Sequence, residues 1–319
     1  MQGINHLNKY AFVIPVYNDW ESVTKLLDNI IAVIPDKSDL TFILVNDASS
    51  VPFETVSFAR LESDVIFLDL SRNMGHQRAI AVGLAYANEH VPAQAYIVLD
   101  SDGEDRPEDI ALLIEKAENF DGVVFAKRAK RSEGLVFRLF YTAFKFAFFL
   151  LTGKKISFGN FSIFQQHQLS RIVHISDIWN HFSGGIIRSG IPYASVDTIR
   201  GKRYYGQSKM NFVRLILHGL SAISVYADFM AIRLIIASII ISAFTVAGII
   251  TAASIRLFTN LAIPGWATFT ILALAILLLL TLLTGFQLIF NVLILKTQRT
   301  IIPAKDYGEY IINVRKSSP

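Results

Sequence analysis

The hydrophobic and polar positions change their pattern along this chain. In its first part, short apolar runs closed by turn residues alternate with segments of helical spacing. Such runs are typical of buried strands, and the helical spacing predicts helices over Trp20–Ile34 and Gly75–Glu89 and from about Pro107. The predicted strands are Tyr10–Val16, Thr41–Val45, Val65–Leu70, Ala95–Leu99 and Gly122–Ala126.

This alternation of strands and helices predicts an α/β fold with a mostly parallel sheet that is covered on both faces. Ligands of such sheets bind at the carboxyl ends of the strands. The glycine fingerprint of dinucleotide-binding folds is missing, which disfavours a dinucleotide ligand. Polar residues collect at the predicted strand ends, namely Asn18, Asp47, Asn73, Asp100 and Asp102.

Two long apolar segments lie near the C-terminus. Ile232–Ile255 has 24 residues, or about 36 Å of helix, which is enough to cross a hydrocarbon core of about 30 Å. After a short link, Trp266–Leu295 is long enough to cross back, and Trp266 suits a membrane interface. We therefore predict a hairpin of two transmembrane helices.

Basic residues indicate the orientation of this hairpin. Only Arg256 lies in the link, whereas several basic residues flank the outer ends, and no signal peptide is evident at the N-terminus. We therefore expect an integral membrane protein with two spans whose α/β domain and both termini are cytoplasmic. The flanking residues are Arg214 and Arg233 before the hairpin and Lys296, Arg299 and Lys305 after it.

The second span carries two polar residues, Gln287 and Asn291, one helical turn apart. Their side chains could donate hydrogen bonds to the first span or to a partner subunit, and a homo-oligomer is therefore one of the expected states. Binding of a lipid by this pair is a weaker alternative.

Two further segments are expected at the membrane surface. Gly134–Thr152 is crowded with Phe and Tyr but is interrupted by Arg138 and Lys145, which favours an interfacial helix over a third span; a helix buried in the protein core is the alternative. Asn211–Phe229 is a second candidate. The predicted division is an α/β domain (1–210), a juxtamembrane amphipathic helix (211–231), two transmembrane helices (232–295) and a cytoplasmic tail (296–319).

Composition narrows the classes of partner. Hydrophobic residues make up 52% of the 319 residues, and the formal net charge is +4. A basic balance is compatible with nucleic acid, an anionic membrane or an anionic ligand, but zinc-finger spacing and long Lys/Arg tracts are missing, so we expect no nucleic-acid partner. The absence of cysteine excludes disulfides, thiol catalysis and cysteine-based metal sites.

The strongest chemical signal is an acidic segment, Asp100–Glu108, which follows a predicted strand. Mg²⁺ and Mn²⁺ prefer oxygen ligands and often take only one or two carboxylates, with phosphate and water as the other ligands. The alternative is an acidic first turn for the following helix, which accounts well for Glu108 and Asp109 but less well for the acids before them.

Five motifs in register make the sequence similar to a known family. The chain resembles family-2 inverting glycosyltransferases of the polyprenyl-phosphate type, which include dolichyl-phosphate mannose synthase and bactoprenol glucosyltransferases. The resemblance covers about the first 210 residues, and the two-span tail matches the bactoprenol branch. It implies a GT-A-like nucleotide-sugar-binding domain with a C-terminal transmembrane hairpin. The motifs are VIPVYND (13–19), VNDASS (45–50), SRNMGHQRAIAVGLAYA (71–87), LDSDGEDRPED (99–109) and RYYGQSK (203–209).

The resemblance also implies roles for individual residues. Asp47 would hold the nucleotide base or its ribose with Asp100 nearby, although an Asp there could instead form a turn. The other residues that the resemblance places around the donor are Pro15, Tyr17, Asn18, Gly75, His76 and Gln77.

On the phosphate side, Asp102 would bind a divalent cation that bridges the donor diphosphate. Glu104 departs from the glutamine that is usual in the family, and its added charge would strengthen the cation site. Arg203 and Lys209 match a loop that closes over the phosphates; a solvated basic loop is the alternative. The resemblance therefore implies Mg²⁺ or Mn²⁺ as cofactor.

The family grips its lipid phosphate with arginines near the membrane. Lys127, Arg128 and Arg138 stand in the corresponding stretch. Arginine suits this role because its planar fork meets phosphate oxygens in pairs. Ordinary snorkelling of basic side chains at the interface accounts for these residues equally well.

A second departure concerns a candidate catalytic base. The family often has Gly-Asp-Phe-Arg where this chain has Gly159-Asn160-Phe161-Ser162, and an amide cannot take a proton. A lipid phosphate is already anionic near pH 7 and needs alignment more than deprotonation. Otherwise the acceptor differs and the base lies elsewhere, or activity is lost.

The sequence thus predicts an enzyme with its catalytic domain in residues 1–210. It would transfer a sugar, with inversion, from a nucleoside-diphosphate sugar to a polyprenyl phosphate at the membrane, a reaction of cell-envelope synthesis. Two alternatives stay open. One is a transferase that acts on a saccharide hydroxyl of a lipid-linked acceptor, and the other is a non-catalytic membrane scaffold that binds nucleotide sugar.

Overall fold

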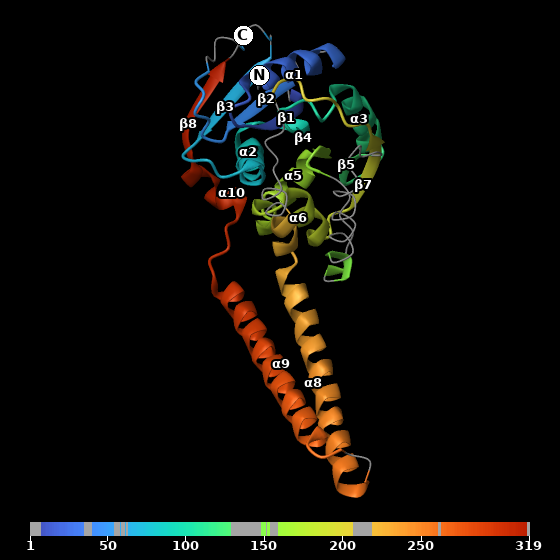
Figure 1. Cartoon of the computed structure of the whole chain (residues 1–319). Helices are drawn as coiled ribbons and strands as arrows, with labels where there is room; N and C mark the ends of the chain where they lie inside the picture. The colour runs from blue at the N-terminus through green and yellow to red at the C-terminus, as the bar shows by residue number, and fades with distance from the viewer. Residues whose placement is uncertain are drawn as a thin grey trace. The chain divides into compact units, whose positions relative to one another are not determined.

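The structure is a computed structural model. It describes residues 8–34, 40–53, 58, 61, 63–128, 148–150, 152–153, 159–206, 219–260 and 263–317. The chain forms two compact units. The first consists of residues 1–141, 155–225 and 300–319, and the second of residues 142–154 and 226–299. The first unit contains a sheet with helices, and the second contains a helical hairpin (Figure 1).

The first unit is built on an eight-stranded mixed sheet whose order is β7-β5-β6-β4-β1-β2-β3-β8. Strands β1, β2, β3 and β4 run parallel to one another, and β5 runs parallel to β7, whereas β6 and β8 run antiparallel to their neighbours. The strands are β1 (Asn8–Val16), β2 (Leu40–Asn46), β3 (Asp64–Leu70), β4 (Ala93–Val98), β5 (Val123–Arg128), β6 (Ser162–Gln165), β7 (Tyr193–Thr198) and β8 (Ile311–Ser317).

Alternate residues of each central strand enter two different cores. In β1, Ala11 and Val13 face one core, whereas Phe12 and Ile14 face the other. Because both faces are covered by helices, the central strands are apolar throughout rather than alternating with polar residues. Helices α1 (Trp20–Val33) and α3 (Ile110–Glu118) cover one face; α2 (His76–His90), α5 (Gln166–Ile172) and α6 (Phe182–Ser189) belong to the other.

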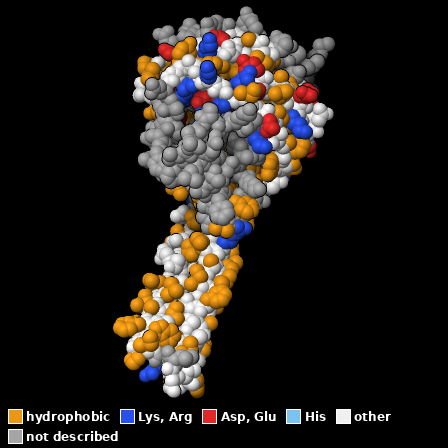
Figure 2. Space-filling model, turned by 45° about the vertical axis from the view of Figure 1, so that its right-hand side comes forward, with side chains coloured by type: hydrophobic (Ala, Val, Ile, Leu, Met, Phe, Trp, Pro, Cys, Tyr) orange, Lys and Arg blue, Asp and Glu red, His pale blue; other side chains and the backbone are white. Residues whose placement is uncertain are grey.

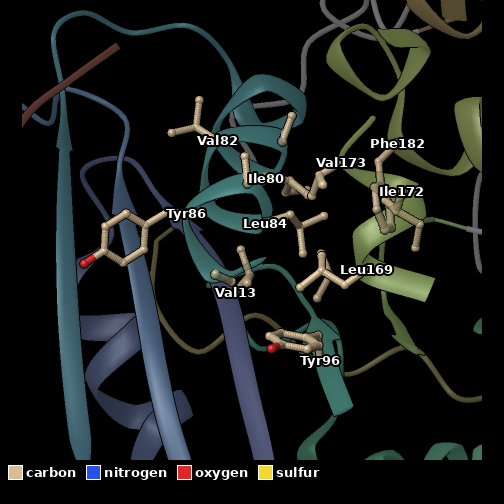
Figure 3. Close-up of a cluster of buried hydrophobic side chains, with 14 of the residues drawn as sticks. Val13, Ile80, Val82, Leu84, Tyr86, Tyr96, Leu169, Ile172, Val173 and Phe182 are labelled. Atoms are coloured by element: carbon tan, nitrogen blue, oxygen red, sulfur yellow. The ribbon is translucent and has the colours of Figure 1, made fainter. Parts of the chain in front are cut away.

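Helix α2 is the centre of the second core. Figure 3 shows its Ile80 and Leu84 facing Leu169 and Val173 from the α5 region, with Val13 of β1 beside them. The helix lies very close to the sheet at Gly83, where an added Cβ would be 2.6 Å from side-chain carbons of both Val13 and Val45. This close approach packs the middle of α2 directly against β1 and β2.

The chain returns to the sheet after the hairpin. Helix α10 (Pro303–Asp306) and the 3-10 turn η5 (Tyr307–Tyr310) lead into β8, which pairs antiparallel with β3 from Leu70↔Ile311 to Val65↔Ser317. No strand was predicted in the tail 296–319. In the structure, residues 300–319 belong to the first unit, and β8 completes the sheet.

The second unit contains α8 (Ala227–Phe258) and α9 (Trp266–Thr297), both of 32 residues. They are the two helices, among the described residues, that are long and apolar enough to cross a membrane. They pack along each other, and the hydroxyls of Ser242 and Thr281 are 3.1 Å apart between them. Figure 2 shows apolar side chains over the outer surface of this unit, whereas charged side chains gather on the first unit.

The predicted hairpin thus agrees with two helices that extend beyond Ile232–Ile255 and Trp266–Leu295. Gln287 donates to Asn291 within α9, at 3.2 Å. Most of the predicted interfacial helix (134–152) lies outside the described residues, as do residues 211–218 of the predicted juxtamembrane helix; residues 219–224 are helical.

Candidate active site

Of the polar residues identified in the sequence, Asn73 follows β3, and the others follow β1, β2 and β4, three parallel neighbours in the sheet. Their carboxyl ends therefore lie at one edge. The Asp47 amide donates to the carbonyl of Val16 at 2.9 Å, which joins the segments after β2 and β1. The side chains at this edge come from three segments: residues 17–19, residues 46–53 (hereafter the serine loop) and residues 100–105 (hereafter the acidic turn).

Asp47 connects the end of β2 to the start of α2. Its two carboxylate oxygens accept the backbone amides of Met74 at 2.6 Å and Gly75 at 2.9 Å. The side chain is 3% exposed. Burial raises the pKa of the Asp47 carboxyl above its usual value, while these two hydrogen bonds and the positive charge of Arg78 act in the opposite direction. The structure thus brings together two predicted donor-site residues, Asp47 and Gly75.

Asn18 fastens the segment after β1 to the serine loop. The backbone amide of Asn18 donates to the Ser49 hydroxyl at 2.9 Å, and the side-chain oxygen of Asn18 accepts the Val51 backbone amide at 3.0 Å. Asn18 and Ala48 both have φ of 53°, in the left-handed region that residues other than glycine seldom adopt. Tyr17 is 41% exposed beside this turn, and Pro15 lies in β1 opposite Val45.

The acidic turn contains Asp102, whose carboxylate oxygen Oδ1 accepts the Glu104 amide at 2.9 Å. Asp105 faces back and accepts the Asp100 amide at 3.1 Å. Gly103 allows the chain to turn between Asp102 and Glu104 because its φ is +81°. Asp102 is therefore held by the backbone of its own turn.

Residues 199–206, hereafter the arginine loop, close on the acidic turn. Gly201 and Tyr204 donate their amides to the carbonyls of Glu104 and Asp102, at 2.8 and 3.0 Å. The Tyr204 ring then covers Gly103, where an added Cβ would be 2.4 Å from the ring. The Tyr204 hydroxyl accepts from the side chain of Asn29, at 2.8 Å, which ties the loop to α1.

Two arginines of this loop pair with the acids of the turn. Arg203 Nη2 lies 2.8 Å from Asp102 Oδ2 and 3.8 Å from Asp19 Oδ2. Arg200 binds both carboxylate oxygens of Glu104 at 2.7 to 3.0 Å. Opposite charges are thus matched at the edge of the sheet, and the contact between Arg203 and Asp102 brings together two predicted catalytic residues.

Gln77 and Asn160 form a separate buried pair. The Gln77 amide group donates to Asn160 Oδ1 at 3.0 Å and accepts the Phe182 amide at 2.5 Å. Ser162 donates its hydroxyl to the Asn160 carbonyl at 3.0 Å. Asn160 is thus held by Gln77 of α2, whose own side chain is fixed by the start of α6. His76 lies at the start of α2. Desolvation by nearby protein atoms lowers the pKa of its imidazole below the ordinary value.

Of the predicted acceptor residues, Lys127 is placed at the end of β5. Its ammonium lies 3.8 Å from Asp197 of β7, an exposed ion pair. Arg128 ends β5, but its side chain lies outside the described part of the structure, as do Arg138 and the predicted catalytic residue Lys209. Their roles stay predictions.

Comparison with known proteins identifies the family. Residues 11–185 match the domain described as glycosyl transferase family 2. The chain belongs to this family. The matched residues include the serine loop, the acidic turn and the pair Gln77–Asn160, and they end before β7 and the arginine loop.

Relatives of this glycosyltransferase include an uncharacterized glycosyltransferase and an undecaprenyl-phosphate transferase. An uncharacterized glycosyltransferase of Bacillus subtilis is 27% identical over 277 residues, which are 83% of each chain. An undecaprenyl-phosphate 4-deoxy-4-formamido-L-arabinose transferase of Photorhabdus laumondii is 27% identical over 231 residues, which are 67% of this chain and 66% of that protein.

A solved structure confirms the fold. Glucosyl-3-phosphoglycerate synthase of Mycobacterium tuberculosis, in complex with uridine diphosphate, has a TM-score of 0.50 at 14% identity and covers 70% of this chain and 80% of its own. This likeness concerns the fold alone. The predicted α/β fold of the GT-A type is thereby confirmed. The family match over residues 11–185 separately confirms the predicted family and the classification as a glycosyltransferase.

A divalent cation fits this glycosyltransferase site only together with a substrate. Among the described residues, no three acidic or histidine side chains converge as a metal cluster. A hard cation can, however, bind through one or two carboxylates and complete its shell with phosphate oxygens and water. Asp102 can supply one such carboxylate ligand, provided that Arg203 releases the Oδ2 atom that it now holds at 2.8 Å.

Two residues of the glycosyltransferase site were not predicted. Arg200 pairs with Glu104 across 96 positions of sequence, and Asp19 lies near Arg203. The sequence offered one sign of Arg200. It precedes Arg203 by three residues in IRGKRYYGQSK, so the two arginines belong to the same loop. Asp19 ends VIPVYND, but an acid directly before a helix is also an ordinary N-terminal residue.

Proposed function

We propose that this glycosyltransferase transfers a sugar from a nucleoside-diphosphate sugar to a polyprenyl phosphate, with inversion, at the cytoplasmic surface of a membrane. The observation that carries the proposal is the closure of the arginine loop on the acidic turn. There Arg203, a cation suited to phosphate, lies 2.8 Å from the carboxylate suited to a metal. The second unit, with its two long apolar helices, supports a lipid acceptor.

The donor would occupy the edge of the sheet next to β1, β2 and β4. Its base and ribose would lie against Tyr17, Asn18 and Asp47, and Asp100 would stand near the ribose. Support comes from the exposure of Tyr17 beside Asn18 and from the rigid turn that Asn18 makes with the serine loop. Gly75 and His76, at the start of α2, would face the sugar and phosphate side.

The donor diphosphate would bind between the acidic turn and the arginine loop. Asp102 would hold Mg²⁺ or Mn²⁺, which when bound neutralises charge on the departing diphosphate. Arg203 would then exchange its contact with Asp102 for one with a phosphate oxygen, and Lys209 would add a second positive charge. Glu104 would join the cation only by leaving Arg200, which holds both of its oxygens. We therefore assign Asp102 the principal role.

The reaction would be an in-line displacement. An oxygen of the lipid phosphate forms a bond to the anomeric carbon, while the bond from that carbon to the diphosphate breaks and its electron pair leaves with the nucleoside diphosphate. Attack from the opposite face inverts the anomeric configuration. The second pKa of a phosphate monoester is about 6, so the attacking oxygen is already anionic near neutral pH and its reaction depends on alignment.

The lipid phosphate would approach near Lys127, Arg128 and Arg138, which suit its charge. Anchoring by α8 and α9 would confine the enzyme to the surface that carries this acceptor and raise its effective concentration. The preponderance of basic residues outside the link of the hairpin supports a cytoplasmic position for the first unit and both termini.

Transfer of a radiolabelled sugar tests the proposal. The full chain, reconstituted in lipid, is supplied with a panel of nucleotide sugars and with a polyprenyl phosphate, and product is extracted into organic solvent. We expect a labelled lipid with one donor and its loss with EDTA, reversed by Mn²⁺ or Mg²⁺. Label that appears only on a saccharide hydroxyl, or binding of every donor without transfer, contradicts the proposal and favours the corresponding alternative.

A substitution at Asn160 tests whether the reaction needs a base there. Asn160→Asp keeps the oxygen that accepts from Gln77 and supplies a carboxylate. Because a phosphate acceptor needs no deprotonation, we expect kcat to change less than about threefold, well under the 10²–10⁴-fold contribution of a general base. Steady-state kinetics with the polyprenyl phosphate measure this.

The matched control is Asn160→Ala, which removes the acceptor and leaves the buried amide of Gln77 without this partner, at a cost of about 1–3 kcal/mol. It should lower the unfolding midpoint more than Asn160→Asp does. A rise of a hundredfold or more in kcat for Asn160→Asp would show that the wild-type chain lacks a base that its reaction needs.

A further inference from the structure

The strand that follows the hairpin carries an arginine directed at the donor side of the sheet. Arg315 of β8 binds Asp69 of β3 with two parallel hydrogen bonds, Nε to Oδ2 at 3.0 Å and Nη2 to Oδ1 at 2.8 Å. The Asp69 side chain is 14% exposed. Paired bonds of this kind fix a carboxylate in both position and orientation. Asp69 is thus oriented by a residue 246 positions further along the chain.

From Asp69, a line of hydrogen bonds leads to the serine loop. The side-chain amide of Asn46 donates to Asp69 Oδ1 at 2.8 Å. This bond fixes the orientation of the Asn46 side-chain oxygen. That oxygen accepts the amide of Ser49 at 2.9 Å. The Ser49 hydroxyl in turn accepts a hydrogen bond from the backbone amide of Asn18, also at 2.9 Å. The line thus runs through the side chain of Asn46 and then through the backbone amide and the hydroxyl of Ser49.

A second set of contacts leads from Arg315 to the same loop. The guanidinium lies over the ring of Phe53, 4.5 Å from its centroid. Phe53 stacks on Trp20 with ring centroids 3.6 Å apart. The indole nitrogen of Trp20 donates to the carbonyl of Val51 at 3.1 Å. Arg315 is therefore linked to both ends of the serine loop, to Asn46 through Asp69 and to Phe53 by direct contact.

We propose that Arg315 is a positioning residue for the donor nucleotide: by fixing Asp69 and Phe53, it holds the serine loop and Asn18 in the shape that binds the base. The inference rests on the proposed function, because it concerns the site assigned there to the nucleotide. It gives the C-terminal strand a role in donor binding, while Arg315 itself contacts neither the reacting atoms nor the phosphates.

The conformation of the loop is the reason that it needs such support. Asn18 and Ala48 both have positive φ, and a residue other than glycine in that region costs on the order of 1–3 kcal/mol unless its surroundings enforce it. Ser49 and Val51, which are bonded to Asn18, are the residues that the two sets of contacts hold. Without Arg315, we expect the loop to sample shapes in which the site for the base is absent.

The test compares Arg315→Met, Arg315→Lys and the control Lys316→Met, which alters the neighbouring exposed residue of β8. Binding of UDP and GDP to the full chain in lipid nanodiscs is followed by calorimetry, and transfer kinetics give KM and kcat. We expect Arg315→Met to weaken binding of the preferred nucleotide and raise KM about tenfold, with kcat within about twofold. Arg315→Lys should recover part of the loss, and Lys316→Met should match wild type.

A second substitution separates positioning from stability. Asn46→Ala interrupts the line of hydrogen bonds without changing β8, so it should also raise KM. In the double variant with Arg315→Met, KM should rise by much less than the product of the two single effects. Wild-type nucleotide affinity in folded Arg315→Met, or independent effects in the double variant, overturns the inference while leaving the proposed function intact. If wild type binds no nucleoside diphosphate, the proposed function fails and the inference with it.

Discussion

Replacing Asp102 by asparagine should lower kcat by roughly 10²–10³-fold and raise the concentration of Mn²⁺ needed for half-maximal transfer. The carboxylate would hold the cation that neutralises the leaving diphosphate, a contribution of several kcal/mol, and each 1.36 kcal/mol corresponds to a tenfold change in rate. Metal titrations of the sugar-transfer rate, at saturating donor, measure both effects. The substitution keeps the shape of the side chain, including an oxygen that can accept the Glu104 amide.

The matched control is Asp121→Asn. Asp121 is an exposed acid that pairs with His167 at 2.6 Å and precedes β5, so it lies away from the carboxyl ends of the strands. The Asp121→Asn variant should retain the wild-type rate of sugar transfer. A double-mutant cycle that combines Asp102→Asn with Arg203→Met should show strongly non-additive effects on the transfer rate, because the side chains of Asp102 and Arg203 are in contact. Wild-type rates in Asp102→Asn would remove the basis of the metal role.

A chain that ends after Arg299 should fail to form a stable first unit. It would lack β8, which six residue pairs join to β3. At about 1 kcal/mol for each lost hydrogen bond, the free energy of unfolding would fall by several kcal/mol, a large part of the 5–15 kcal/mol that is typical of a whole domain. Phe53 and Phe67 would also lose the guanidinium of Arg315, and Asp69 would lose its partner.

Thermal unfolding in detergent, followed by tryptophan fluorescence, measures this loss. The control is a chain that ends after Ser317, the last residue of β8. We expect the control to unfold at the wild-type midpoint, and the shorter chain to unfold at a much lower temperature or to aggregate. An unchanged midpoint for the shorter chain would mean that β8 contributes little to the sheet.

The central strands could be predicted from the sequence because a strand that is buried on both faces of the sheet appears as an uninterrupted apolar run. The run of β2 is buried at every position from Leu40 to Val45, and a short apolar run that ends in Asn46 and Asp47 is typical of a buried strand. The ends of α2 were also predicted to within a residue, since Gly75 precedes it. The hairpin was predicted from hydropathy alone, for the same reason: its pattern is long and uninterrupted.

The edges of the sheet left weaker signals. In β7, exposed and half-buried residues alternate, and Asp197 lies within the strand, while β8 contains Asn313, Arg315 and Lys316. Such strands satisfy their hydrogen bonds on one side only and tolerate charge, so no apolar run marks them. Short β6, with four residues, was missed for lack of length.

The site was readable where a motif is continuous and unreadable where distant segments meet. LDSDGED predicted the acidic turn and Asp102, and RYYGQSK predicted Arg203, but nothing in either motif indicates that they lie in contact 101 positions apart. The same holds for Gln77 and Asn160, each taken from its own motif and found bonded to the other. Pairing of this kind depends on the register of the sheet, which local sequence does not encode.

The place of β8 in the chain has a consequence for biosynthesis. Asp69 and Arg315 are 246 residues apart, so at about 5–20 residues per second the ribosome needs on the order of 12–50 seconds between them. During that interval both hydrophobic helices emerge, while β3 still presents an open edge that can pair with another chain. We therefore expect nascent chains to need protection at this edge, and the serine loop to take its final shape only after β8 has been synthesised.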